Sequence, residues 1–263
     1  MALLAWLKGD PKSARRLSNE AIRRASELGR VQSTQIAYII TNTLEIFRGD
    51  PDAALRSSER ALEFARRHGL TFYAAFAEVY SAWARSRLSM PQAGIVELRQ
   101  AIANFVKLGN KLVVPRFLGL LAERQADAED HDAAFKTIDE ALARASETGE
   151  RHTDPFLHRL HGDILLKRDP ASPAPAEEAF QTAIAIAEEQ GARSYVLLAS
   201  LSLAKLYRST ARPNEAYAVL ALALEGFTPT PEMPEIAEAQ ALLESLARGG
   251  EGAIASKDQA TEG

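Results

Sequence analysis

Apolar positions recur with helical spacing along almost the whole chain, interrupted at regular intervals by short polar turns. Gly29, Gly69, Gly109, Gly149 and Gly191 each follow an apolar run, and successive glycines are 40, 40, 40 and 42 residues apart. A glycine in this place is typical of a helix C-terminus, because it adopts the left-handed cap conformation at little cost. The pattern predicts repeats near 1–30, 31–70, 71–110, 111–150, 151–192 and 193–230.

Small residues occupy fixed places within these repeats. An alanine stands eight residues before each glycine, at Ala21, Ala61, Ala101, Ala141 and Ala183. Seven residues before that alanine stand Ala14, Ala54, Gly94, Ala134 and Ala176, and a sixth copy continues with Ala216 and Ala223. Small side chains at helical spacing let two helix backbones approach closely. We therefore interpret these positions as helix–helix contact points.

Each repeat divides into two helices, because a polar turn such as RGDPD interrupts it near its middle. Pro and Asp suit the first turn of the second helix. Helix pairs of this size cannot bury an apolar face alone, so neighbouring pairs stack into one extended core. The predicted fold class is all-α, an α-solenoid of about six antiparallel pairs over residues 1–248. A helix near 232–247 caps it, and residues 249–263, which lack periodicity, are predicted to be a disordered tail.

Composition and motifs exclude several classes of function. The chain has no cysteine, which rules out disulfides and thiolate chemistry and fits a cytoplasmic location. It also lacks any apolar run long enough to span a membrane. No phosphate-binding loop, dinucleotide fingerprint, serine-hydrolase elbow or zinc-protease motif is present. We therefore expect no cofactor and a protein that binds rather than catalyses.

Histidines gather in one stretch, which holds His152, His158 and His161 together with Asp154 and Asp163. Two histidines three positions apart could ligate a metal. His152, however, precedes the predicted helix, whose N-cap we expect at Asp154, and Asp163 points away from His161. The alternative interpretation, which we prefer, is a set of packed or capping histidines that share one repeat.

The small and aromatic positions resemble the tetratricopeptide (TPR) repeat. The last copy shows Leu203-Ala204-x-x-Tyr207 followed by Ala216 and Ala223, and the fifth shows Gly162-x-x-Leu165. Departures from the pattern are Asn42 at a small position and Glu45, Arg85 and Gln125 at the aromatic one. The 40-residue period also exceeds the usual 34 residues. The resemblance is therefore to a long-helix variant of the repeat.

Residues 113–247 resemble a narrower group, the C-terminal TPR regions of bacterial multidomain signalling proteins. The segments that carry this resemblance are ETGER, HRLHGDILL and the Gln-Gly-Ala-Arg before the last helix pair. In such proteins an adenylate/guanylate cyclase or DNA-binding domain precedes an ATPase module and helical repeats follow. The first helix is predicted to be short, so either a partner pairs with it or the chain is the tail of a longer protein. The resemblance agrees with the second alternative, in which an upstream ATPase or cyclase domain would contact apolar residues Leu3, Leu4, Trp6 and Leu7, which we expect to be exposed.

We expect the chain to be a protein-interaction scaffold or regulatory repeat module of a bacterial signalling or transcription system, with a peptide or protein domain in its concave groove. By resemblance to TPR groove positions, the residues predicted to bind that partner are Thr43, Phe47, Trp83, Arg87, Arg116, Glu123, Arg159, Asp163, Lys205 and Arg208. Two other hypotheses stay open. One is a small-ligand sensor, and the other is a nucleic-acid binder that uses arginine pairs such as Arg23-Arg24.

Overall fold

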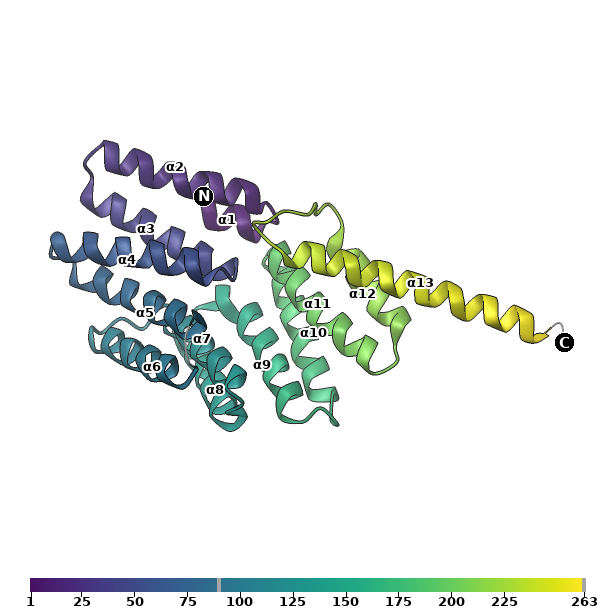
Figure 1. The fold of residues 1–263 in the computed structure, drawn as a ribbon. Coiled ribbons are helices and arrows are strands. Elements are labelled where there is room, and N and C mark those ends of the chain that lie inside the picture. The colour runs from purple at the N-terminus through teal and green to yellow at the C-terminus, as the bar shows by residue number, and fades with distance from the viewer. Residues whose placement is uncertain (89–90, 262–263) are drawn as a thin grey trace.

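The computed structural model describes the backbone of residues 1–88 and 91–261 and the side chains of residues 1–88 and 92–248. Within these residues the chain is all-helical (Figure 1). The helices are α1 (Ala2–Leu7), α2 (Pro11–Glu27), α3 (Val31–Phe47), α4 (Pro51–Arg67), α5 (Thr71–Leu88), α6 (Pro91–Lys107), α7 (Val114–Asp127), α8 (His131–Thr148), α9 (Asp154–Arg168), α10 (Ala174–Glu189), α11 (Arg193–Ser209), α12 (Pro213–Leu224) and α13 (Glu235–Thr261), with a 3₁₀ turn η1 (Arg151–Thr153) before α9.

The first twelve helices form six consecutive antiparallel pairs, so the predicted α-solenoid is confirmed (Figure 1). The first helix of each pair also contacts the first helix of the next pair, from α1 through α3, α5, α7 and α9 to α11. Because these first helices pack on one another, they lie on the inside of the curve, and the second helices α2, α4, α6, α8, α10 and α12 form its outer layer. None of the helices in the described residues is long and apolar enough to cross a bilayer.

The turns between helices follow the predicted chemistry. All five repeat glycines, from Gly29 to Gly191, have positive φ at helix ends. Asp10, Asp50 and Asp130 each cap the second helix of a pair, and each carboxylate accepts a hydrogen bond from the backbone N–H three residues later. Glu129 and Ala211 hold a left-handed conformation at the turn where the first two repeats have glycine. In the third repeat the sequence Leu88-Ser-Met-Pro91 predicts the corresponding turn, and its residues Ser89 and Met90 lie outside the described residues.

Small residues at the predicted contact points are buried where helices cross. Ala14, Ala54, Ala134, Ala176 and Ala216 are fully buried. A Cβ placed on Gly94 would lie 2.5 Å from Ser86 Cβ and closer still to the Ser86 Cα. The backbones of α5 and α6 therefore meet at a distance that only glycine permits. The helix packing inferred from the small-residue pattern is thus observed, although Ala21 is only half-buried.

The first and last repeats contact each other, which brings the two ends of the solenoid together (Figure 1). We call this contact the clasp and define it by Trp6, Ser194, Tyr195, Phe227 and Glu232. The Ser194 hydroxyl donates a hydrogen bond to the Trp6 carbonyl. The ring of Phe227, which follows α12, packs on the turn after α1 at Gly9.

Charged residues extend the clasp from the α12–α13 connection to the second repeat. The Glu232 carboxylate lies 2.8 Å from the Arg48 guanidinium and 3.8 Å from that of Arg15. Both arginines also hold the buried carboxylate of Glu45. Two arginines and two glutamates from distant parts of the chain therefore form one network.

The clasp corrects one sequence-based expectation. Trp6 is only 1% exposed, because Phe47 and Tyr195 of the same chain cover its ring, and Leu3 and Leu7 pack partly against the same cluster. Leu4 alone of the four predicted interface residues is well exposed. The expectation of an exposed apolar face was wrong for Trp6. The contact between α1 and α11 that buries it depends on tertiary structure, which the local sequence pattern does not show.

Two helix ends also differ from the predictions. Asp154 is the first residue of α9 and not its N-cap, because the 3₁₀ turn η1 precedes the helix and places Thr153 at the cap. Helix α13 runs to Thr261, past the predicted end at 247. The side chains of 249–263 lie outside the described residues, and the disorder expected of this tail stays a prediction.

Candidate functional site

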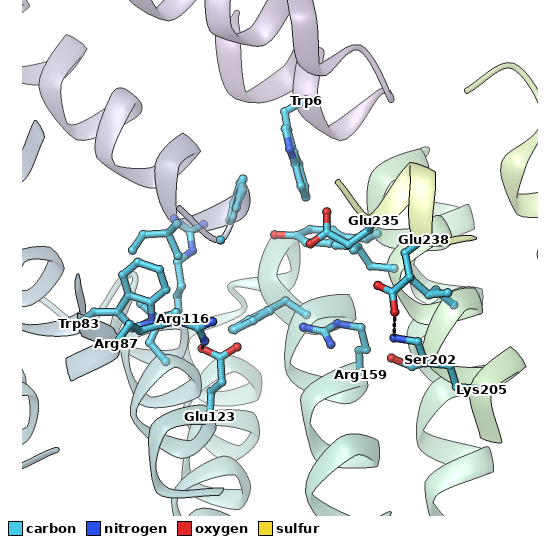
Figure 2. A pocket seen from close by; sticks show the side chains of 18 residues that line it. Trp6, Trp83, Arg87, Arg116, Glu123, Arg159, Ser202, Lys205, Glu235 and Glu238 are labelled. Atoms are coloured by element: carbon cyan, nitrogen blue, oxygen red, sulfur yellow. Dashed lines mark ion pairs between the residues drawn. The ribbon is translucent and has the colours of Figure 1, made fainter. Parts of the chain in front are cut away.

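A cavity of about 290 Å³ lies on the inner face of the solenoid (Figure 2). Helices α1, α3, α5, α7, α9, α11 and α13 all contribute side chains to it. Because α1 and α13 come from opposite ends of the chain, the clasp is what completes the cavity. Its volume is close to the lower limit of ordinary small-molecule sites, about 300 Å³.

Aromatic rings form one wall of the cavity. The ring centroid of Trp6 lies 4.6 Å from that of Phe47 and 5.5 Å from that of Tyr195. Phe156 lines the same space, with the Arg159 guanidinium 6.0 Å from its ring centroid. Burial raises the pKa of the Tyr195 hydroxyl to about 12, so this phenol stays protonated at neutral pH. These rings offer an apolar surface to a ligand.

Charged side chains also line the cavity, and they continue into a second hollow of about 420 Å³ lined by α7, α9 and α11. Glu123, Arg159, Ser202 and Lys205 belong to both spaces. We call the two spaces together the inner groove. Its charges are largely paired within the chain, by the contacts Lys205–Glu238 (2.7 Å), Arg159–Asp163 (2.7 Å), Lys167–Asp127 (2.8 Å) and Arg87–Glu123 (3.7 Å).

Arg116 is the most deeply buried cation of the cavity. Pro115 at the start of α7 precedes it, and the guanidinium stacks 5.4 Å from the ring centroid of Phe47. A guanidinium nitrogen of Arg116 lies 2.7 Å from Nε2 of His152, which must accept because the guanidinium can only donate. Burial and the charge of Arg116 lower the pKa of His152 to about 4. His152 is therefore a neutral acceptor at neutral pH.

Two carboxylates of the groove have raised pKa values. Glu235, the first residue of α13, and Asp163 on α9 are both partly shielded from solvent, and burial raises the pKa of each. Arg159 lies near both carboxyls and opposes the shift. A further positive charge beside either carboxyl would lower its pKa again.

The structure brings seven of the ten predicted groove residues to the wall of the 290 Å³ cavity. These are Phe47, Trp83, Arg87, Arg116, Glu123, Arg159 and Lys205. Asp163 lines the adjoining hollow. Thr43 and Arg208 line neither space: Thr43 is buried, with its hydroxyl 2.9 Å from that of Tyr80, and Arg208 is exposed elsewhere on α11. That these residues bind a partner stays a prediction.

Sequence reasoning missed several cavity residues because they are supplied by the chain ends. Trp6 was assigned to an outer interface, and Tyr195, Glu235 and Glu238 were not singled out. Phe156 also escaped notice, although its place on the first helix of a pair matches that of other groove residues. The position of Phe156 in its repeat could therefore have predicted that it lines the cavity. The cavity residues of α1 and α13 could not be predicted in this way, because they reach the cavity only through the clasp.

The histidine stretch lies on α9 and η1 without assembling a metal site. His161 Nε2 stands 3.8 Å from a carboxylate oxygen of Asp139, and its ring packs near Phe135 at 5.5 Å between centroids. Burial lowers the pKa of both His158 and His161. No group of three or more potential ligands that could hold a metal ion occurs in the part of the chain that the structure describes.

The fold and the cavity define a helical-repeat protein with ligand-sized space on its inner face. No family model matches the chain. An uncharacterized protein of Rhizobium meliloti (strain 1021) is 23% identical over 206 residues, which is 78% of this chain and 20% of that protein. The chain thus spans about one fifth of the length of this relative.

Among solved structures, the chain is similar to one described as a circular tandem repeat protein with novel repeat topology and enhanced subunit contact surfaces. The match covers 99% of this chain and 70% of that chain, with 16% sequence identity and a TM-score of 0.24. A TM-score this low supports no conclusion about shared shape or function.

Proposed function

We propose that this chain is a non-catalytic binding module that takes an extended peptide segment of a partner protein along the inner groove. The resemblance to bacterial signalling proteins suggests that it serves there as a regulatory or scaffolding element. The observation that carries the proposal is the groove itself, which runs along α7, α9 and α11 with exposed ion pairs on its walls.

Ion pairs of this kind suit recognition of a segment rather than catalysis. Lys167 and Lys205 are each roughly half exposed and already hold a carboxylate, so a partner's charged side chains can exchange with their present partners at small net cost. Such exchange contributes specificity more than affinity. The neighbouring aromatic cavity supplies the apolar burial that affinity needs.

The proposal is tested by selecting peptides from a displayed library on the immobilised protein and measuring their affinity for two variants. Lys167→Glu reverses one charge in the groove and breaks one exposed pair with Asp127. Arg66→Glu does the same on the outer layer, where Arg66 pairs with Glu78 at 3.0 Å. We expect groove-binding peptides that place a carboxylate against Lys167 to lose about tenfold in affinity, or about 1.4 kcal/mol, on Lys167→Glu alone. Equal binding to both variants, or failure to select any peptide, contradicts the proposal.

A second candidate is a small-ligand sensor, and one observation favours it. The cavity is closed on several sides because α1 and α13 cover it, and a flat peptide groove would not need that cover. A ligand seated there contacts both ends of the solenoid and so stabilises the clasped state over any opened one.

A further inference from the structure

Two charged side chains of the cavity lack an ion-pair partner in the part of the chain that the structure describes, unlike the other charged side chains of the inner groove. Arg116 and Glu235 line the same cavity, and among the described residues neither has an oppositely charged group within 4.0 Å. The other charges of the groove hold partners, as the pairs given above show. Figure 2 shows Arg116 and Glu235 on opposite sides of the cavity beneath Trp6.

No carboxylate of the described residues pairs directly with Arg116. It is 6% exposed, and its guanidinium contacts the neutral imidazole of His152, the ring of Phe47 and the hydroxyl of Tyr80. The carboxylate of Glu150 attracts Arg116 from beyond direct contact, and its Oε1 lies 3.5 Å from His152 Nε2. The Nε of Arg116 also lacks a hydrogen-bond partner. A buried cation surrounded by neutral groups is costly, and an anion in the cavity would offset that cost.

Glu235 needs a positive charge in the same way. Its Oε2 is shielded from solvent and has no hydrogen-bond partner. Arg159 and Lys205 are the cations that attract the Glu235 carboxylate. Each already forms an ion pair, Arg159 with Asp163 and Lys205 with Glu238. The start of α13 places the carboxylate at a helix N-terminus, which compensates only a fraction of a full charge.

We propose that the cavity binds a small zwitterion, an amino acid or a dipeptide with an apolar side chain. Its carboxylate pairs with Arg116, its ammonium group pairs with Glu235, and its side chain packs against the rings of Trp6, Phe47 and Phe156. A simple anion leaves Glu235 without a partner, and a simple cation leaves Arg116 without one. The inference rests on the small-ligand candidate and does not depend on a peptide binding in the groove.

Calorimetric titration of the full chain with four probes tests the charge requirement. The probes are L-phenylalanine, the dipeptide glycyl-L-phenylalanine, N-acetyl-L-phenylalanine, which lacks the ammonium charge, and L-phenylalaninamide, which lacks the carboxylate. We expect one or both zwitterions to bind, and each blocked form to bind at least about tenfold more weakly. The tighter of the two zwitterions identifies the source of the ligand. Binding that is equal for free and blocked forms, or absent for all four, overturns the inference.

Matched variants then locate the two ends of the ligand. Glu235→Gln should remove the preference for the free ammonium over the N-acetyl form, whereas Glu244→Gln, at an exposed position of α13 away from the cavity, should preserve it. Arg116→Gln should remove the preference for the carboxylate over the amide. If the Arg116→Gln variant loses its helical circular dichroism signal, the comparison of Glu235→Gln with its control on α13 tests the assignment by itself. An unchanged preference in Glu235→Gln overturns the assignment.

The peptide-groove variant separates this inference from the proposed function. Lys167 lines only the second hollow, so Lys167→Glu should leave zwitterion affinity within about twofold of the original protein. Loss of zwitterion binding in Lys167→Glu counts against a ligand held between Arg116 and Glu235. Loss of peptide binding alone leaves the zwitterion result standing.

Discussion

Replacing Trp6 with alanine should open the clasp while most of the solenoid stays folded. Trp6 is almost fully buried against Phe47 and Tyr195, in a first repeat that packs against the second repeat and the far end of the chain. A buried tryptophan covers about 200 Å², which at about 25 cal/mol per Å² corresponds to about 5 kcal/mol. Alanine keeps a small part of this burial, so we expect the local free energy of opening to fall by about 4 kcal/mol.

Hydrogen exchange measured by mass spectrometry on intact protein resolves this prediction by region. A loss of 4 kcal/mol corresponds to nearly a thousandfold faster exchange where clasp opening limits it. The acceleration should appear in α1, at the start of α11 and in the connection from Glu225 to Pro234, while α5 to α8 keep their protection. Leu4→Ala, at an exposed position of the same helix, is the control and should change little. Faster exchange throughout the chain, or none at α11, would refute the role assigned to Trp6.

Three smaller predictions follow from local geometry. Ala211→Gly should raise the free energy of unfolding by about 1 kcal/mol in urea titrations and Gly49→Ala should lower it by a similar amount, because both positions have positive φ. Gly94→Ala should destabilise by about 1–2 kcal/mol, since overpacking against Ser86 outweighs the gain in helix propensity; a stabilised variant would disprove the close approach. His152 should titrate by NMR near pH 4, and its depressed pKa means that stability is full above about pH 6.5 and declines as pH falls toward 4.

The repeat architecture could be predicted because its determinants are local. Glycine at a helix end, aspartate at an N-cap and alanine at a crossing point act within one or two turns of the chain, so their spacing shows in the sequence. The clasp could not be predicted this way. It depends on the small rotation between successive pairs, summed over six repeats, and no single residue encodes that sum.

The candidate site could likewise be predicted where it depends on the repeat pattern and not where it depends on the clasp. Residues such as Trp83, Arg116 and Arg159 could be predicted by resemblance to TPR groove positions, because a first helix presents the same face in every repeat. Thr43 satisfies that spacing as well, yet it is buried because Tyr80 of the next repeat lies over it. Glu235 follows a connection without repeat character, so its arrival at the cavity depends on tertiary structure alone.

The meeting of Trp6 with Tyr195 also limits how this protein can change length during evolution. An open solenoid tolerates gain or loss of a repeat, because a new pair simply extends the stack at either end. Here an inserted or deleted pair would carry α1 past or short of α11 and leave both ends without their counterpart. A variant with one helix pair added or removed would therefore lose the contact between Trp6 and Tyr195.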